Sequence, residues 1–430
     1  MAIQGLRTAG VDRGDGTYNG FIADQRPLDW RTGLLMLHPN GMAPLTALTS
    51  QMKKRTATDP EFNWWDKALR SQRYQLGVDL PTGATVTLTT PDALEFRPGH
   101  MVLVENTGEI FRVTTVDSAT QLTVLREATE DNPGAGTAVD ISVAGTNPYL
   151  QIIGSAFEEG SQKPVSLAFD PVKHNNFTQI FRSNLGLTRT AMKTRLRTGD
   201  QVREAKRECL EYHGIEMERA FWLGAKQETS LGGSPIRYTG GFQHFIDPLR
   251  DWSGVGGAGA SRVTDYTSVS GVVDMLMLET LLKDAFEFGS SEKVGFCGNT
   301  ALMCINQIVR KNSVYNIYVN EKEYGMKVAR LVCPFGEVVL KTHPLWNQSP
   351  GGTVAGTKFF GMDSWLAIMD MANMTYRPLE DSDTKYLPDQ QTNGQDGMES
   401  GYLTEAGLEF AHPQTMALAR GLAVGETDGA

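Results

Sequence analysis

The chain has 430 residues, of which 21% are charged and 40% hydrophobic, the composition of a globular protein that can bury large cores. Its formal net charge of -10 argues against a protein that coats DNA by general electrostatic attraction. The polar, glycine-containing amino terminus lacks the apolar core of a secretory signal, and no run of about eighteen apolar residues predicts a membrane span.

The four cysteines are predicted to be buried, reduced thiols. None forms a CxxC pair, and the gap between Cys297 and Cys304 fits no usual zinc spacing. Cys209 and Cys333 likewise stand in apolar or helical sequence, where cysteine behaves as a small hydrophobic residue.

The first part of the chain reads as an arm without a core of its own. Residues 1–24 show no apolar periodicity, and 27–50 carry scattered apolar anchors such as Trp30 between prolines that interrupt any long helix. Further on, Trp64 and Trp65 are adjacent, so in a strand they face opposite sides. One of them then packs in its own core and the other contacts a neighbour, or both share one core.

Residues 80–146 have the pattern of a small β barrel or sandwich inserted into another fold. Short runs rich in Val and Thr, at 84–89, 100–105, 109–116 and 121–126, alternate between apolar and polar residues. Gly and Pro mark both borders. Residues 87–144 contain nine acidic and three basic side chains, a net charge of -6.

Residues 148–196 read as extended and end in a basic stretch. Between 182 and 197 the chain has five basic residues and no acidic one. This stretch is either solvated surface or a contact with another subunit or with nucleic acid. Its basic residues are Arg182, Arg189, Lys193, Arg195 and Arg197.

A long helix is predicted over 199–224. Thr198 and Gln201 have the spacing of a capping box, an apolar stripe runs through Cys209, Tyr212 and Met217, and Gly224 ends the pattern. A compact α/β unit then follows at 265–315, with helices at 270–288 and 299–311 and a buried strand at 293–297. A hairpin at 327–341 and further strands at 358–370 and 402–409 close the chain.

The sequence offers no convincing catalytic, cofactor or metal site. The GxGxxG match at 254–259 follows no predicted strand and opens no helix, as a dinucleotide site requires. The seven histidines are scattered, and carboxylates such as Glu158 and Glu159 lie in polar stretches where nothing raises a pKa. We therefore predict no catalytic residue, no cofactor and no metal.

The order of parts resembles the subunit of tailed-phage shells, the Hong Kong 97-type capsid fold. Five stretches resemble the branch of phage capsid proteins related to the roseophage SU-ten type. They are DPEFNWWDKAL at 59–69, GDQVREAKRECLEYHGIEMERAFWLG at 199–224, YTGGFQHFI at 238–246, YGMKVARLVCPFGEVVLKTHPL at 324–345 and YLTEAGLEFAHP at 402–413. The segment 80–146 departs from the plainest members of that branch.

The resemblance implies an α+β fold and a role as major capsid protein. Its parts would be an N-terminal arm (1–75), an E-loop with the β module (76–198), a spine helix opening the P-domain (199–262), an A-domain (263–375) and closing P-domain strands with the tail (376–430). Hexamers and pentamers would close into an icosahedral shell around phage double-stranded DNA, which has at most non-specific contact with the subunits.

The same resemblance implies further partners and a place. Scaffold, decoration and portal proteins are possible partners, no membrane is involved, and the protein would belong to the virion after assembly in the host cytoplasm. The alternatives are an encapsulin-like nanocompartment shell, or an enzyme with a β-rich substrate module. Candidate contacts between subunits are Trp30, Trp64, Trp65, Arg182, Arg189, Lys193, Arg195 and Arg197.

Overall fold

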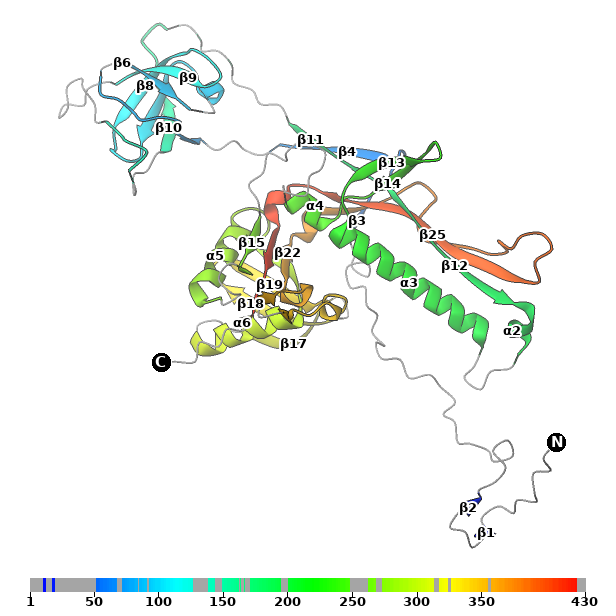
Figure 1. The fold of residues 1–430 in the computed structure, drawn as a ribbon. Helices are drawn as coiled ribbons and strands as arrows, with labels where there is room; N and C mark the ends of the chain where they lie inside the picture. The colour runs from blue at the N-terminus through cyan, green and yellow to red at the C-terminus, as the bar shows by residue number, and fades with distance from the viewer. Residues whose placement is uncertain are drawn as a thin grey trace. The chain divides into compact units, whose positions relative to one another are not determined.

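The computed structural model of the chain is shown in Figure 1. It describes residues 52–423 together with two short paired strands, β1 (Val11–Asp12) and β2 (Tyr18–Asn19). Gaps in this description lie at 68–71, 84, 91–92, 127–137, 144–148, 162, 164–165, 167–170, 195–199, 248–261, 268–272, 313–316, 324–325 and 355–356. The chain divides into two compact units, residues 65–173 and residues 1–64 with 174–430.

The unit at 65–173 is a β barrel with its own core. Its six strands run in the spatial order β5 (Arg73–Gln75), β10 (Tyr149–Ser155), β7 (His100–Val104), β8 (Ile110–Val116), β9 (Gln121–Leu125) and β6 (Thr85–Thr89), with the short 3-10 helix η1 (Ala93–Glu95) before β7. All the pairings are antiparallel. The Gly77 amide donates to the Thr89 carbonyl at 2.7 Å and the Thr90 hydroxyl to the Gln75 carbonyl at 3.0 Å, so the two outer strands meet.

Alternation explains why these runs form a barrel. Every second residue of β6 and β7 is buried, as a strand with one face on a core requires. The four strands predicted between 84 and 126 are confirmed, and the sheet also includes β5 and β10, which lie outside 80–146. Arg126, almost fully buried, pairs with Glu109 and donates to the Pro81 carbonyl at 2.5 Å, which ties the end of β9 to the start of β6.

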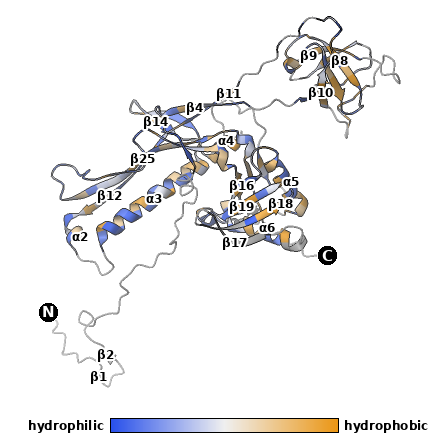
Figure 2. Cartoon of the chain, turned by 180° about the vertical axis from the view of Figure 1, so that it is seen from behind, coloured by the Kyte–Doolittle hydropathy of each residue, from blue (hydrophilic) through white to orange (hydrophobic). Residues whose placement is uncertain are grey.

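The second unit contains a five-stranded sheet covered by one long helix. The sheet has the order β12 (Gln179–Thr188), β25 (Gly397–Phe410), β23 (Met374–Pro378), β3 (Lys53–Lys54), and β24 (Lys385–Leu387) also pairs with β25. The helix α3 (Gln201–Leu223) packs on β12 and β25, and the short helix α2 (Arg189–Lys193) lies between β12 and α3 in the chain. In Figure 2 the residues of the amino-terminal half of α3 are coloured mostly as hydrophilic.

A seven-stranded mixed sheet forms the other part of this unit. Its order is β15 (Val263–Asp265), β26 (Ala417–Arg420), β22 (Leu366–Met369), β16 (Glu292–Cys297), β19 (Gly336–Thr342), β18 (Met326–Cys333) and β17 (Ile317–Glu323). Helices α5 (Met275–Phe286) and α6 (Asn299–Asn312) pack on its core (Figure 2). In α5 the residues Leu278, Leu281, Leu282 and Ala285 are buried, the spacing of one helical face.

The remaining elements are short. They are β4 (Glu61–Asp66) paired with β11 (Val172–Phe177), the hairpin β13 (Gln227–Leu231) and β14 (Ser234–Tyr238), α4 (Phe242–Ile246), the pair β20 (Gly352–Val354) and β21 (Thr357–Phe359), and the 3-10 helices η4 (Trp346–Gln348), η5 (Met362–Ser364), η6 (Met371–Asn373) and η7 (Pro413–Thr415).

The predicted α+β composition and the three main helices are confirmed, and so are the four cysteines as free, buried thiols. The predicted capping box is wrong. Asp200 is the N-cap of α3, and its carboxylate accepts from the Val202 amide at 3.0 Å. An Asp in that position also places a negative charge at the positive end of the helix dipole, which Thr198 would not do.

Candidate subunit interface

The two adjacent tryptophans lie on opposite faces of β4. Trp64 is buried, and its ring lies 5.9 Å from His174, 6.1 Å from Phe62 and 5.7 Å from Phe245. The Trp65 side chain is 63% exposed. Trp64 therefore packs within its own subunit, whereas Trp65 presents a large apolar surface to solvent.

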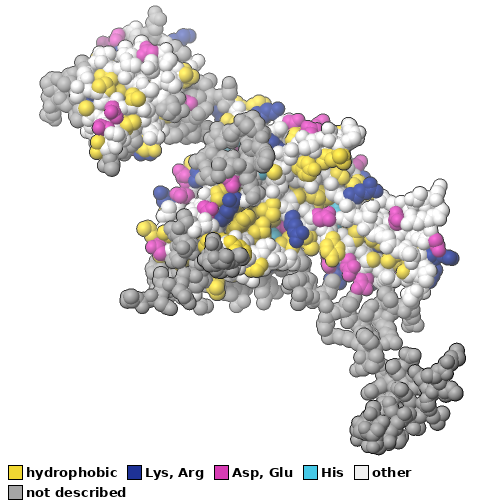
Figure 3. Space-filling view, viewed as in Figure 1, with side chains coloured by type: hydrophobic (Ala, Val, Ile, Leu, Met, Phe, Trp, Pro, Cys, Tyr) yellow, Lys and Arg dark blue, Asp and Glu magenta, His cyan; other side chains and the backbone are white. Residues whose placement is uncertain are grey.

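The predicted basic stretch is divided between a strand and a short helix. Arg182 lies on the exposed face of β12 and donates to the Gln390 side chain at 3.0 Å. Arg189 begins α2 and pairs with Asp396 at 2.8 Å, and Lys193 is exposed in the last turn of α2. On the face in Figure 3, basic and acidic side chains are interspersed instead of forming one patch of a single sign.

Three predicted contact residues lie outside the described residues. They are Trp30 in the N-terminal segment and Arg195 and Arg197 between α2 and α3.

The buried face of α3 is partly polar, which the predicted apolar stripe did not include. His213 is buried, with Ser183 Oγ at 3.0 Å from Nδ1 and Thr404 Oγ1 at 2.8 Å from Nε2. Burial lowers the pKa of His213 below its usual value, which favours the neutral ring. Because the Thr404 hydroxyl donates to Thr384, it accepts from Nε2–H, and Nδ1 then accepts from Ser183.

A second buried polar group joins α3 to the seven-stranded sheet. Both the Trp222 indole and His343 Nε2 lie 2.8 Å from Glu218 Oε1, and the side chains of Glu218 and His343 are almost fully buried. Trp346 stacks on His343 at 4.8 Å. The His343 imidazole, which follows β19, therefore links that strand to the helix.

Sequence reasoning missed these residues for an identifiable reason. It placed Tyr212 on the inner stripe, but this side chain is 66% exposed, while Cys209, His213 and Met217 face inward. The signal was present in the sequence, because Cys209, His213 and Met217 follow one another at intervals of four residues and therefore lie on one face of the helix.

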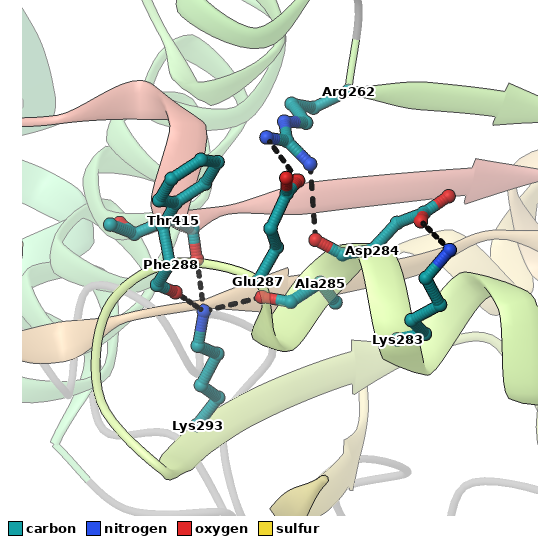
Figure 4. A network of polar contacts seen from close by, with 8 residues as sticks. All are labelled: Arg262, Lys283, Asp284, Ala285, Glu287, Phe288, Lys293 and Thr415. Carbon is teal, nitrogen blue, oxygen red and sulfur yellow. Dashed lines mark hydrogen bonds and ion pairs between the residues drawn. The ribbon is translucent and has the colours of Figure 1, made fainter. Parts of the chain in front are cut away.

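The carboxyl end of α5 is held by a buried lysine. Lys293 Nζ donates to the carbonyls of Ala285 at 2.6 Å, Phe288 at 2.7 Å and Thr415 at 2.6 Å (Figure 4). Burial lowers the pKa of Lys293 to about 8. Beside it, Arg262 donates to the Asp284 carbonyl and the Glu287 carboxylate at 3.0 Å each, next to a cavity of about 450 Å³.

Within the described part of the chain, no three His, Cys, Asp or Glu side chains form a group that could hold a metal ion. No helix in the described ranges is long and apolar enough to cross a membrane. The exposed candidate contacts in the described part of the chain are Trp65 on β4 and the basic side chains Arg182, Arg189 and Lys193 on β12 and α2.

Comparison with known proteins agrees with this picture. The family model of the SU10 major capsid protein matches residues 15–423. The chain is 28% identical over 399 residues to a major capsid protein of Pseudomonas phage PaMx41, covering 89% of this chain and 90% of that one.

Solved structures similar to the chain include two capsids. The capsid of Myoviridae phage XM1 has a TM-score of 0.44 at 10% identity, covering 94% of this chain and 99% of that one. The capsid of the empty GTA particle has a TM-score of 0.43 at 9% identity, covering 97% and 100%. The family match over nearly the whole length confirms the α+β capsid fold that the order of elements predicts, and the chain belongs to the SU10 major capsid protein family.

Proposed function

We propose that this chain forms an icosahedral phage shell by assembling into hexamers and pentamers that enclose double-stranded DNA. The observation that carries the proposal is the family match over residues 15–423. The major capsid protein of phage PaMx41, which aligns with nine tenths of the chain, favours a phage shell over a nanocompartment.

We assign the five roles expected from the sequence to the parts of the chain as follows. The segment 1–75 would be the arm, and the excursion 76–198 would carry the barrel as an E-loop insertion. In 199–262 the helix α3 would be the spine, which at 23 residues and about 1.5 Å per residue is about 35 Å long. The part 263–375 holds most of the seven-stranded sheet and would be the A-domain, and 376–430 would close the P-domain with β25.

Among the candidate contact residues that the structure describes, Trp65 has the greatest apolar surface to give to a neighbour. Burial of an exposed aromatic side chain is a common source of interface energy. Arg182, Arg189 and Lys193 would add charge complementarity, which guides association more than it strengthens it. Trp30, Arg195 and Arg197 complete the proposed set.

A matched pair of variants tests the tryptophans. We expect Trp65→Ala to leave the unfolding of the free subunit unchanged and to weaken assembly, because Trp65 is exposed. Trp64→Ala should instead destabilise the subunit by about 3 kcal/mol, because it removes a buried ring. Urea unfolding and sedimentation velocity measure the two effects, and equal assembly by Trp65→Ala and the unaltered chain would contradict this contact.

We propose a structural role without catalysis and a location in the virion, after assembly in the host cytoplasm. Packaged DNA would make at most non-specific contacts with a chain of net charge -10. Scaffold, decoration and portal proteins are the expected partners of such a shell.

Sedimentation velocity and negative-stain electron microscopy of the purified chain test the proposal. Closed shells, or rings of five and six subunits, are the expected result. A monomer or dimer that stays small at every protein and salt concentration contradicts it. Particles from infected cells should contain DNA; protein-filled particles would instead indicate a nanocompartment.

A further inference from the structure

The strand β12 lies at one edge of the five-stranded sheet. It pairs along its whole length with β25, from Gln179 opposite Ala406 to Thr188 opposite Gly397, without a register shift. Its other side has no neighbouring strand among the described residues.

The hydrogen bonds of β25 reveal which residues of β12 turn their backbone outward. The Glu405 carbonyl accepts from the Leu379 amide and the Glu405 amide donates to the Ser382 carbonyl, both away from β12. In an antiparallel pair, a residue that turns its backbone away faces one that does the same. Ile180, opposite Glu405, therefore turns its N–H and C=O to the outer edge.

The same holds further along the strand. The Glu399 carbonyl accepts from the Gln390 amide, again away from β12, and Glu399 lies opposite Gly186. The alternation therefore places the backbone groups of Ile180, Arg182, Asn184 and Gly186 on the outer edge, while the odd-numbered residues between them bond β25.

Just before the start of β12, the outer edge already makes a backbone hydrogen bond within the chain. The Thr178 amide, in the same alternation, donates to the Pro60 carbonyl at 2.8 Å. Beyond that point, no backbone hydrogen bond in the described part of the chain reaches the edge from 180 to 186. The strand contains no proline or bulge, two devices that keep an edge from pairing with another chain, and Arg182 is its one charged residue.

We propose that the edge of β12 binds an extended strand of a second copy of this chain. This inference rests on the proposed function, because a shell brings many copies of the chain into contact. A second copy also suits the charges, since Arg182 and Lys193 are exposed on β12 and α2 while the chain as a whole has a net charge of -10. Backbone hydrogen bonds supply the affinity in such strand addition.

Hydrogen exchange with single-residue resolution tests the proposal without any substitution. In the free subunit, the amides of Phe181, Ser183 and Leu185 should be protected and those of Arg182 and Asn184 should exchange quickly. In assembled particles, the even-numbered amides should become protected by about tenfold or more. Even-numbered amides that exchange equally fast in both states would overturn the proposal.

Asn184→Pro provides a second test. Proline removes the outward N–H of residue 184 and none of the bonds to β25, and edge strands tolerate it. Asn184→Ala is the matched control, because it keeps the N–H. We expect the protein concentration needed for assembly to rise about tenfold or more for Asn184→Pro and to stay the same for Asn184→Ala.

The two proposals fail differently. If the unaltered chain never assembles, the proposed function is wrong and this inference falls with it. If it forms shells and folded Asn184→Pro, checked by circular dichroism, assembles at the same concentration, only this inference is wrong. If Asn184→Pro does not fold, the exchange experiment decides.

Discussion

Asn176 joins three segments that are far apart in the sequence. Its side-chain amide donates to the Gly240 carbonyl at 3.0 Å and to the Leu408 carbonyl at 2.8 Å, and its oxygen accepts from the Gly240 amide at 2.7 Å. The residue is fully buried. The side chain thereby connects β11 and β25 to the turn that precedes α4.

Asn176→Asp should destabilise the subunit strongly. The change keeps the shape of the side chain but replaces its NH2 group with a carboxylate oxygen. The Gly240 and Leu408 carbonyls then lose their hydrogen-bond donor, and the new oxygen repels both of them. We expect a loss of about 3–5 kcal/mol in the free energy of unfolding at neutral pH, measured by urea unfolding.

The control for this variant is Asn175→Asp. Asn175 is only half-buried, and its side chain bonds Glu61 and Lys226 near the surface. A change of less than about 1 kcal/mol is expected there. Similar losses for both variants would mean that Asn176 has no special role in joining the segments.

Lys293 makes the stability of the seven-stranded part depend on pH. Its pKa is about 8 in the folded chain, lowered by burial from 10.5, so the folded state releases this proton at lower pH than the unfolded state. Between these values the unfolded chain binds more protons, and a rise in pH therefore favours folding. Below pH 8 both states hold the proton and this dependence ends.

Lys293→Met removes that dependence together with three hydrogen bonds. At pH 7 we expect a loss of about 3 kcal/mol, because three buried carbonyls lose their donor. From pH 8 to 10 the unaltered chain should gain stability relative to the variant, measured by urea unfolding of both at each pH. A difference that stays constant or shrinks over this range would show that the lysine is not held as described.

At the residue scale, the sequence predicted side-chain orientation correctly where the alternation of a strand determines it. It did not predict contacts whose partners are distant in the sequence. Adjacent positions in a strand require Trp64 and Trp65 to face apart, and they do. The partners of Asn176, Glu218 and Lys293 come from segments up to 232 residues away. No local pattern contains such distances.

Two glycines allow the end of α3 to meet the turn before α4. A Cβ on Gly241 would lie 2.6 Å from the Ala220 carbonyl oxygen and 2.7 Å from that of Phe221, and one on Gly224 would lie 2.4 Å from the Thr239 carbonyl oxygen. The Gly241 amide donates to the Gly224 carbonyl at 2.9 Å. Backbone therefore packs directly on backbone at this joint.

Gly241→Ala should push the turn before α4 away from the end of α3, because the added methyl clashes with backbone atoms that cannot move without shifting the helix. We expect the free energy of unfolding to fall by about 2–4 kcal/mol. Gly214→Ala, in α3 itself, is the matched control. Nothing lies within 4 Å of a Cβ there, so alanine should stabilise the helix by about 0.5–1 kcal/mol. Thermal unfolding of both variants checks the opposite signs, and a stabilised Gly241→Ala would contradict the close packing.

At the scale of elements, the sequence identified α3, α5, α6 and the main strands, because their apolar periods are long and clear. It did not reveal which strands share a sheet. The parallel pairing of β16 with β19 and the place of β26 beside β22 depend on crossovers, which local patterns leave undetermined.

The whole chain consists of two compact units, and the boundary between them differs from the border that the sequence suggested. The Val- and Thr-rich alternating runs at 80–146 form the middle strands of the barrel, but β5 and β10 on either side of this segment complete its sheet. Tyr74, Leu76, Leu150 and Ile152 from these flanks belong to the barrel core. β5 has only three residues, too few to show a period, and β10 was expected only as part of the extended stretch 148–196, without a sign that it pairs in the barrel.

Two deletions distinguish these boundaries. Replacing 80–146 with a short glycine linker removes four strands and leaves the apolar side chains of β5 and β10 without a core, so we expect aggregation. Replacing 68–171 with the same kind of linker removes the whole barrel and joins β4 to β11, which already pair with each other.

The chain that remains after this second deletion keeps the hydrophobic clusters around α3 and the seven-stranded sheet. We therefore expect it to unfold cooperatively near the unfolding temperature of the full chain. Circular dichroism melts and gel filtration of both deletions measure this, and an unfolded 68–171 deletion would show that the rest of the chain depends on the barrel for its stability.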